Sequence, residues 1–196
     1  MTINFFAHAK SPAKQESGFT LVELMVVVAI IAFIGALAIP NLSPANARLK
    51  RAARELYGTL QRARTEAIKQ NQNVGIVFDT ANDQYLLCQG TDGDNACTDA
   101  GETILATITL SSYGNDIRFA GGLAIPPVSG SYPDDGVSYG TGSVTINNSM
   151  FFTPQGRTTT LGYVYLTNNK DTVYAVGTPS LGGVIVMKKR TNSSWQ

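Results

Sequence analysis

The sequence is poor in the residues from which most catalytic and metal sites are built. It has one histidine, His8, and two cysteines among 196 residues, and its formal net charge is +1. It also lacks a glycine-rich loop with the lysine that binds phosphates. Because no histidine follows residue 8, a His-based triad is excluded from the rest of the chain and a zinc centre is disfavoured. We therefore expect a protein that is not an enzyme and that needs no cofactor.

The most conspicuous feature that is present is a long apolar run near the N-terminus. Residues 19–40 contain one ionised side chain, Glu23, and a helix that spans a bilayer needs roughly 20 apolar residues. Three interpretations compete: a signal peptide cleaved at an A-x-A site over 36–38, an uncleaved anchor, and a segment cut before the apolar run. For a plain anchor, the basic residues that follow the run would place the rest of the chain in the cytoplasm.

A resemblance supports the third interpretation. Residues 14–40, KQESGFTLVELMVVVAIIAFIGALAIP, resemble the N-terminus of type IV prepilins and type II secretion pseudopilins. In that family a short basic leader ends in Gly, followed by Phe and by T-L-x-E within a hydrophobic helix. The resemblance implies that residues 1–18 are a leader, that prepilin peptidase cuts between Gly18 and Phe19 on the cytoplasmic side, and that Phe19 is then N-methylated.

The same resemblance implies a role for Glu23 in assembly. Cleavage would create an α-amino cation on Phe19, four residues before Glu23. In a filament of stacked subunits, the carboxylate of one chain can pair with the Phe19 amine of its neighbour. Screening is weak inside an apolar bundle of helices, so we expect the pair to set the register of the subunits at the cost of desolvating both charges.

Beyond Pro40, where we expect a kink, the pattern predicts a helix and then strands. Apolar residues recur at three- and four-residue steps up to Gln70. Period-two alternation follows, with strands predicted in NVGIVFDT, QYLLC, TILATITL, SVTIN, MFFT, YVYLT, TVYAV and GVIVMKK. We predict an α+β fold: a long N-terminal helix over 19–72, with a transmembrane half at 19–40 and an amphipathic half, packed on an antiparallel β-sheet head over 73–196.

The two cysteines, Cys88 and Cys97, stand at the ends of the polar stretch CQGTDGDNAC. An exported head would favour a disulfide between them, whereas a cytosolic domain would hold two free thiols. Asp92 and Asp94 have the spacing of calcium ligands, but the stretch lacks the glycine that an EF-hand requires at its sixth position. We favour a polar loop closed by a disulfide and expect no metal.

The C-terminal half resembles the GspH/FimT group of minor pilins and pseudopilins. The resemblance lies in residues 149–189, with an F-x-P-x-G turn at Phe152, Pro154 and Gly156 and a final strand opened by Gly183. It implies a single-pass protein of the bacterial inner membrane with its head in the periplasm. Such a subunit initiates, caps or decorates a type IV pilus or a type II secretion pseudopilus, with other pilins as its partners, and the residues do not separate the two systems.

Some members of that group are DNA-uptake receptors, which gives an alternative function. Lys188, Lys189 and Arg190, followed by Trp195, are the candidate DNA-binding residues, because basic clusters neutralise phosphates without reading the base sequence. The final strand departs from the group's usual Gly-Arg opening, since Val184 follows the glycine. DNA binding is therefore the second hypothesis, behind a structural role.

Overall fold

The structure, a computed structural model of the chain, describes residues 18–38, 44–90, 97, 100–122, 126–129, 133–139, 148–170, 172–191 and 194–196. The chain divides into two compact units, residues 1–42 and residues 43–196. The predicted domains divide the chain at residues 18 and 72 instead, because the first boundary is the expected cleavage point and the second follows the change from helix to strand in the sequence.

The described part of the first unit contains one helix, α1 (Leu21–Ala38). Its sequence has no proline, and its one ionised residue, Glu23, lies in the first turn. Among the residues that the structure describes, no helix combines the length and the apolar character needed to cross a membrane. The membrane pass over 19–40 therefore stays a prediction, and the kink expected at Pro40 lies outside the described residues.

The second unit begins with the amphipathic helix α2 (Pro44–Gln70). A proline at the first helical position is favourable, because its missing N–H would have no intrahelical partner there. The helix ends at Gln70, as predicted, and Asn71 follows in the left-handed region with φ 53°. The N–H of Gln72 donates to the carbonyl of Ala67 at 3.3 Å, which is the hydrogen bond of a Schellman C-cap.

Among the described residues, nine strands form two antiparallel sheets. The first sheet has the order β3-β2-β1-β5, from β1 (Val74–Asp79), β2 (Gln84–Gln89), β3 (Thr103–Thr109) and β5 (Ser149–Phe152). The second has the order β4-β6-β7-β8-β9, from β4 (Arg118–Phe119), β6 (Gly162–Thr167), β7 (Val173–Thr178), β8 (Val186–Thr191) and β9 (Ser194–Trp195). A short 3-10 helix, η2 (Leu110–Tyr113), follows β3.

The α+β fold with antiparallel sheets is confirmed. The alternating segments predicted from the first strand through MFFT, YVYLT and TVYAV correspond to β1, β2, β3, β5, β6 and β7. The last predicted strand is shorter than expected: β8 begins at Val186 rather than Gly183, which has φ 72° and lies in a turn. The short strands β4 and β9 carry too little alternation to predict, and the segment SVTIN lies outside the described residues.

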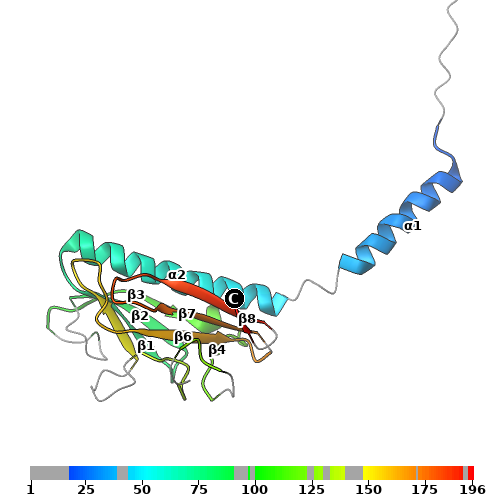
Figure 1. Cartoon of the computed structure of the whole chain (residues 1–196). Helices are drawn as coiled ribbons and strands as arrows, with labels where there is room; N and C mark the ends of the chain where they lie inside the picture. The colour runs from blue at the N-terminus through cyan, green and yellow to red at the C-terminus, as the bar shows by residue number, and fades with distance from the viewer. Residues whose placement is uncertain are drawn as a thin grey trace, which may run out of the picture. The chain divides into compact units, whose positions relative to one another are not determined.

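The main hydrophobic core lies between α2 and the two sheets, and Figure 1 shows α2 (cyan) running along the strands. Leu49, Leu56 and Leu60 on one face of α2 are fully buried. Each buried leucine contributes roughly 1.5–3 kcal/mol. All residues of this core come from 43–196, so the second unit has a complete core of its own and can fold without α1. We call this unit the head.

Candidate functional site

The predicted cleavage point lies in a short extended segment before α1. Gly18, Phe19 and Thr20 precede the helix and are exposed. No other part of the described structure lies within 4 Å of the position that a Cβ would take on Gly18. A peptidase needs an accessible, non-helical peptide bond, and the Gly18–Phe19 bond meets that requirement. Cleavage and N-methylation there stay predictions.

Thr20 and Glu23 form a capping box at the start of α1. The N–H of Glu23 donates to the Thr20 hydroxyl oxygen at 3.2 Å, and the N–H of Thr20 donates to the Glu23 carboxylate at 3.4 Å. The Thr20 carbonyl accepts the first helical hydrogen bond, from Leu24 at 3.2 Å. This reciprocal pattern satisfies two N–H groups that a helix start would otherwise leave without partners.

The sequence contains the signal for this capping box, T-x-x-E before an apolar run, whereas the family resemblance implies for Glu23 only a pairing with a neighbouring amine. The carboxylate therefore has a local role in the single chain. A carboxylate has two oxygens and about four acceptor positions, so one Glu23 can cap its own helix and still accept an ion pair. The two roles are compatible, and they can be separated by mutation.

Over residues 21–34, the described side chains of α1 are exposed and, apart from Glu23, are apolar on all sides. The exposed fraction of its large side chains runs from 76% at Leu21 to 48% at Val27, and Phe19 just before the helix is 82% exposed. A helix that is hydrophobic all round is normally buried in protein or lipid. An exposed apolar surface of this extent indicates a binding surface, so α1 requires a partner or a membrane to cover it.

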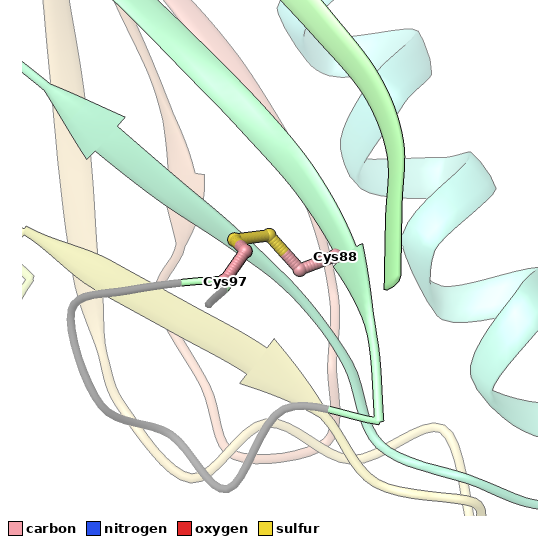
Figure 2. Close-up of a disulfide and its surroundings, with 2 residues drawn as sticks. All are labelled: Cys88 and Cys97. Atoms are coloured by element: carbon pink, nitrogen blue, oxygen red, sulfur yellow. A yellow bond between two sulfur atoms is a disulfide. The ribbon is translucent and has the colours of Figure 1, made fainter. Parts of the chain in front are cut away.

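Figure 2 shows the disulfide between Cys88 and Cys97, with a Cα–Cα distance of 5.9 Å. Cys88 lies in β2, and both sulfurs pack with Val77 in a small buried cluster. The prediction of a disulfide is confirmed, and the alternative of two free thiols is wrong for this structure. The bridge ties Cys97, which lies within the connection between β2 and β3, to strand β2.

The candidate calcium residues give no site that can be described. Asp92 and Asp94 lie outside the described residues. In the part of the chain that the structure describes, no group of three or more His, Cys, Asp and Glu side chains is arranged to hold a metal.

The two glycines singled out in the C-terminal half meet in the fold. Gly156, in the turn after β5, and Gly183, before β8, both have positive φ, 71° and 72°. A Cβ on Gly183 would overlap the carbonyl oxygen of Gly156. Residues of α2 pack against this contact. A Cβ on Gly156 would lie 2.8 Å from Ile68 Cδ1, and Arg64 Nη2 donates to the carbonyl of Gly182 at 3.3 Å. The turn thus docks the C-terminal half of α2.

The three basic residues predicted to bind DNA do not share one face of their sheet. Successive residues of a strand point to opposite faces. In β8, Lys189 lies opposite Tyr174, which belongs to the main core under α2, whereas Lys188 lies opposite Ala175, which belongs to a second cluster on the other face. Arg190, two residues after Lys188, shares that other face. The three side chains therefore form two separate groups.

Trp195, the aromatic residue that accompanies them in the sequence, packs within the protein. Its ring lies 5.7 Å from that of Tyr165, centroid to centroid, and its indole N–H donates to the carbonyl of Pro126 at 2.9 Å. A base-stacking surface needs an open aromatic face. The ring and the indole N–H of Trp195 instead contact other residues of the head.

A cavity of about 370 Å³ lies beside β4, with Asp83, Arg118 and Asp135 in its lining. Both carboxylates hold backbone: Asp83 Oδ1 accepts from the N–H of Phe119, and Asp135 Oδ1 from the N–H of Val137, each at 3.0 Å. These acids therefore fix the strand and loop around them, and the cavity does not add a second group of reactive side chains.

Comparisons with known proteins find matches for both the N-terminal segment and the head. A family model described as "Type II transport protein GspH" matches residues 52–182, which is more than half of the chain, and a model described as "Prokaryotic N-terminal methylation motif" matches residues 13–39. The pilin-like protein PilA1 of Thermus thermophilus is 42% identical over 91 residues, 46% of this chain. The chain spans 58% of the length of that relative.

Two solved structures are similar to the fold. The type IV minor pilin FimU of Pseudomonas aeruginosa matches with a TM-score of 0.51 and 17% identity, over 77% of this chain and 94% of FimU. The minor pseudopilin EpsH from the type 2 secretion system of Vibrio cholerae matches with a TM-score of 0.47 and 16% identity, over 71% of this chain and 95% of EpsH.

Proposed function

Because this chain belongs to the family of the type II transport protein GspH, we propose that it is a structural subunit that initiates, caps or decorates a type IV pilus or a type II secretion pseudopilus. It works by assembly and not by catalysis. Its partners are other pilins or pseudopilins, which it contacts through α1 and through the head.

One observation carries this proposal: an N-terminal methylation motif stands directly on a helix that is apolar on every described side. A soluble protein could not leave such a helix uncovered. In a membrane the lipid covers it, and in a filament the same surface packs against the helices of neighbouring subunits, where close packing selects the arrangement. One helix can thus serve first as anchor and then as filament core.

The processing steps follow from the same motif. Prepilin peptidase removes residues 1–18, and Phe19 becomes the N-methylated terminus. Residues 19–40 hold the subunit in the inner membrane by a single pass, with the head in the periplasm, where an oxidising environment suits the Cys88–Cys97 bridge. On assembly, the Glu23 carboxylate pairs with the Phe19 amine of the neighbouring subunit.

Mass spectrometry of the mature protein tests the processing. We expect a chain that begins with N-methylated Phe19. An intact N-terminus, or a chain that begins after Ala38, would contradict the proposal and favour a plain anchor or a signal peptide. A Gly18 substitution that blocks cleavage should leave the full-length precursor in the membrane fraction.

Substitution of Glu23 separates the two roles of its carboxylate. Glu23→Ala removes both the cap and the charge, whereas Glu23→Gln keeps an oxygen that can serve in a capping box and removes only the charge. If the ion pair drives assembly, both variants insert into the membrane but enter filaments poorly. Normal incorporation of Glu23→Gln would contradict the proposed pairing, and poor incorporation of Glu23→Ala alone would assign the effect to the cap.

DNA uptake is the alternative function that the sequence offers, through Lys188, Lys189 and Arg190. The affinity of the isolated head for duplex DNA, measured across salt concentrations, tests it. A DNA-binding head would lose affinity steeply with salt, in proportion to the number of phosphates it contacts. Lack of binding at low salt, or no loss on replacing the three basic residues, would remove this alternative.

A further inference from the structure

The turn between β6 and β7 lies at the N-terminal end of α2. The side-chain amide of Asn168 donates to the side-chain oxygen of Asn46 at 2.9 Å, across 122 positions of sequence. The N–H of Lys170 donates to the Asn168 side-chain oxygen at 3.1 Å. These bonds hold the turn, and the exposed Lys170 on it, beside the first turn of α2.

The end of β8 lies at the same place. Lys189 is paired with Tyr174 of β7, on the face of the sheet that packs against α2. Burial raises the pKa of Tyr174, and the positive charge of Arg54 partly opposes that rise, so the Arg54 guanidinium lies near this ring. Lys50 lies one helical turn before Arg54, on the same side of α2. Four residues from three elements thus gather at one end of the head.

We call this group the basic end: Lys50, Arg54, Lys170 and Lys189. All four side chains are exposed. Within the described ranges, the ion pairs involve other residues, Arg48 with Asp116 at 3.1 Å and Lys69 with Glu66 at 3.9 Å, and none of the four has an acidic partner. Their charges are therefore available to an external anion.

The other two arginines in the first turns of α2 contact other residues of the head. Arg48 donates to both carboxylate oxygens of Asp116, and the Arg51 guanidinium lies 5.9 Å from the centroid of the Tyr113 ring. The division is spatial: Arg48 and Arg51 turn toward η2 and its following loop, whereas Lys50 and Arg54 turn toward the β7–β8 side. In these first turns of α2, the basic side chains without an ion pair or a cation–π contact, Lys50 and Arg54, therefore lie on that second side.

The position of the basic end in the chain indicates which kind of partner it can bind. The apolar helix α1 ends at Ala38 and α2 begins at Pro44. The connecting residues 39–43 can span at most roughly 20 Å even when fully extended. If α1 is embedded in a bilayer, the chain therefore keeps the start of α2, beside which the basic end lies, within reach of the bilayer surface.

We propose that the basic end binds the anionic phospholipid headgroups of the membrane that anchors α1, and so docks the head on the bilayer before assembly. The proposal rests on the proposed function, because it requires α1 in a membrane. Basic residues near the end of a membrane segment are attracted to anionic lipid, by a factor of about five in partitioning for each residue. Four such residues give a several-hundred-fold preference for anionic over neutral lipid.

Entry into a filament would require this contact to be released. The attraction decays within a Debye length, about 8 Å at physiological ionic strength. A modest lift of the head therefore ends it, so the basic end restrains the head in the membrane without trapping it.

The experiment uses the head alone, residues 43–196, because it has a complete core of its own. Its sedimentation is measured with phosphatidylcholine vesicles that contain or lack phosphatidylglycerol. The test variant replaces Lys50, Arg54 and Lys189 by glutamine. The matched control replaces Arg62, Lys69 and Arg157 by glutamine, which removes the same charge from the C-terminal half of α2 and from the turn after β5.

We expect the unmodified head to bind anionic vesicles and not neutral ones. The test variant should lose on the order of 100-fold in partitioning, while the control stays within a few-fold of the unmodified head. Near-UV circular dichroism and urea midpoints of all three proteins confirm that each is folded. Equal losses in test and control variants would overturn the proposal, since they would show an effect of net charge alone.

Two further outcomes would also overturn it. One is the absence of binding to anionic vesicles at low salt. The other is binding to duplex DNA that exceeds vesicle binding at the same salt and disappears in the same test variant, which would assign the basic end to nucleic acid. The mature N-terminus and the Glu23 variants are measured separately, so failure of the proposed function is distinguishable from failure of this inference.

Discussion

Replacement of Gly183 by alanine should destabilise the head through two effects that the structure locates at one atom. The backbone at Gly183 is left-handed, with φ 72°, and a residue with a Cβ pays roughly 1–2 kcal/mol there. The new Cβ would also overlap the carbonyl oxygen of Gly156. That oxygen belongs to the backbone of a turn covered by α2, so it cannot rotate away as a flexible side chain could.

The size of the effect follows from these two contributions. Overpacking of a well-packed region costs typically about 1–3 kcal/mol, so the sum for Gly183→Ala is about 2–5 kcal/mol. Small domains have roughly 5–15 kcal/mol of stability in total. For a chain of this size the melting temperature should fall by roughly 4–20 °C.

The neighbouring glycine supplies the control. Gly182 has no positive φ, and a Cβ there would lie 3.8 Å from Ser180 Oγ, an ordinary contact. Both alanine variants restrict the unfolded chain equally. The difference between their urea midpoints, measured on the head with circular dichroism, therefore reports strain in the folded state alone. The Gly182→Ala head should be as stable as the unmodified head or slightly more stable.

Equal midpoints for the two variants would refute this reasoning. Such a result would mean that the turn holding Gly156 relaxes freely, and that the contact between the two glycines does not fix the docking of α2. A loss in both variants would instead indicate that the loop before β8 tolerates no side chain at either position.

Three further predictions concern other parts of the molecule. Reduction of the Cys88–Cys97 bridge, with its sequence separation of 9, should lower the free energy of unfolding by about 2.6 kcal/mol on the loop-entropy relation; a double Cys→Ser variant insensitive to reductant is the control. Burial raises the pKa of Tyr85 and Tyr139 above the ordinary 10.0, so the folded state retains protons that the unfolded chain releases. The stabilisation that comes from these two protonated hydroxyls should be complete below about pH 10 and should be lost as the pH rises above it. An unchanged urea midpoint between about pH 8 and about pH 11 would contradict their burial. Thr20→Val should weaken the start of α1 by ~1 kcal/mol, seen as faster amide exchange in its first turn in lipid nanodiscs, while Thr20→Ser should exchange as the unmodified chain does.

Local signals in the sequence were sufficient for much of the fold. Apolar periodicity predicted the end of α2 at Gln70, because the 3.6-residue repeat stops there and a two-residue alternation begins. The segments that became β1, β2, β6 and β7 are long enough to show that alternation. The cysteine pair could be predicted because its two members bracket one short polar stretch, in a chain that the N-terminal resemblance led us to expect outside the cytoplasm.

The same kind of reasoning failed where a contact joins distant positions. The alternation in β8 says that Lys188 and Lys189 face opposite sides, but only the pairing with β7 says which side lies under α2. The two-residue strands β4 and β9 have no periodicity to detect, and form because longer neighbours present free hydrogen-bonding edges. The capping box is present in the sequence as T-x-x-E, but the same residues belong to the pilin motif, so the pattern alone does not distinguish a helix cap from a role in assembly.

The sequence by itself determined that this chain carries an apolar N-terminal segment, an amphipathic helix, a set of antiparallel strands and a disulfide, since each depends on side chains that are near one another in the chain. Only the tertiary structure decided that Gly156 meets Gly183 and that Lys50, Arg54, Lys170 and Lys189 gather at one end of the head. Those encounters depend on strand register and on the packing of α2, which are set by the burial of the whole core and are written in no single segment.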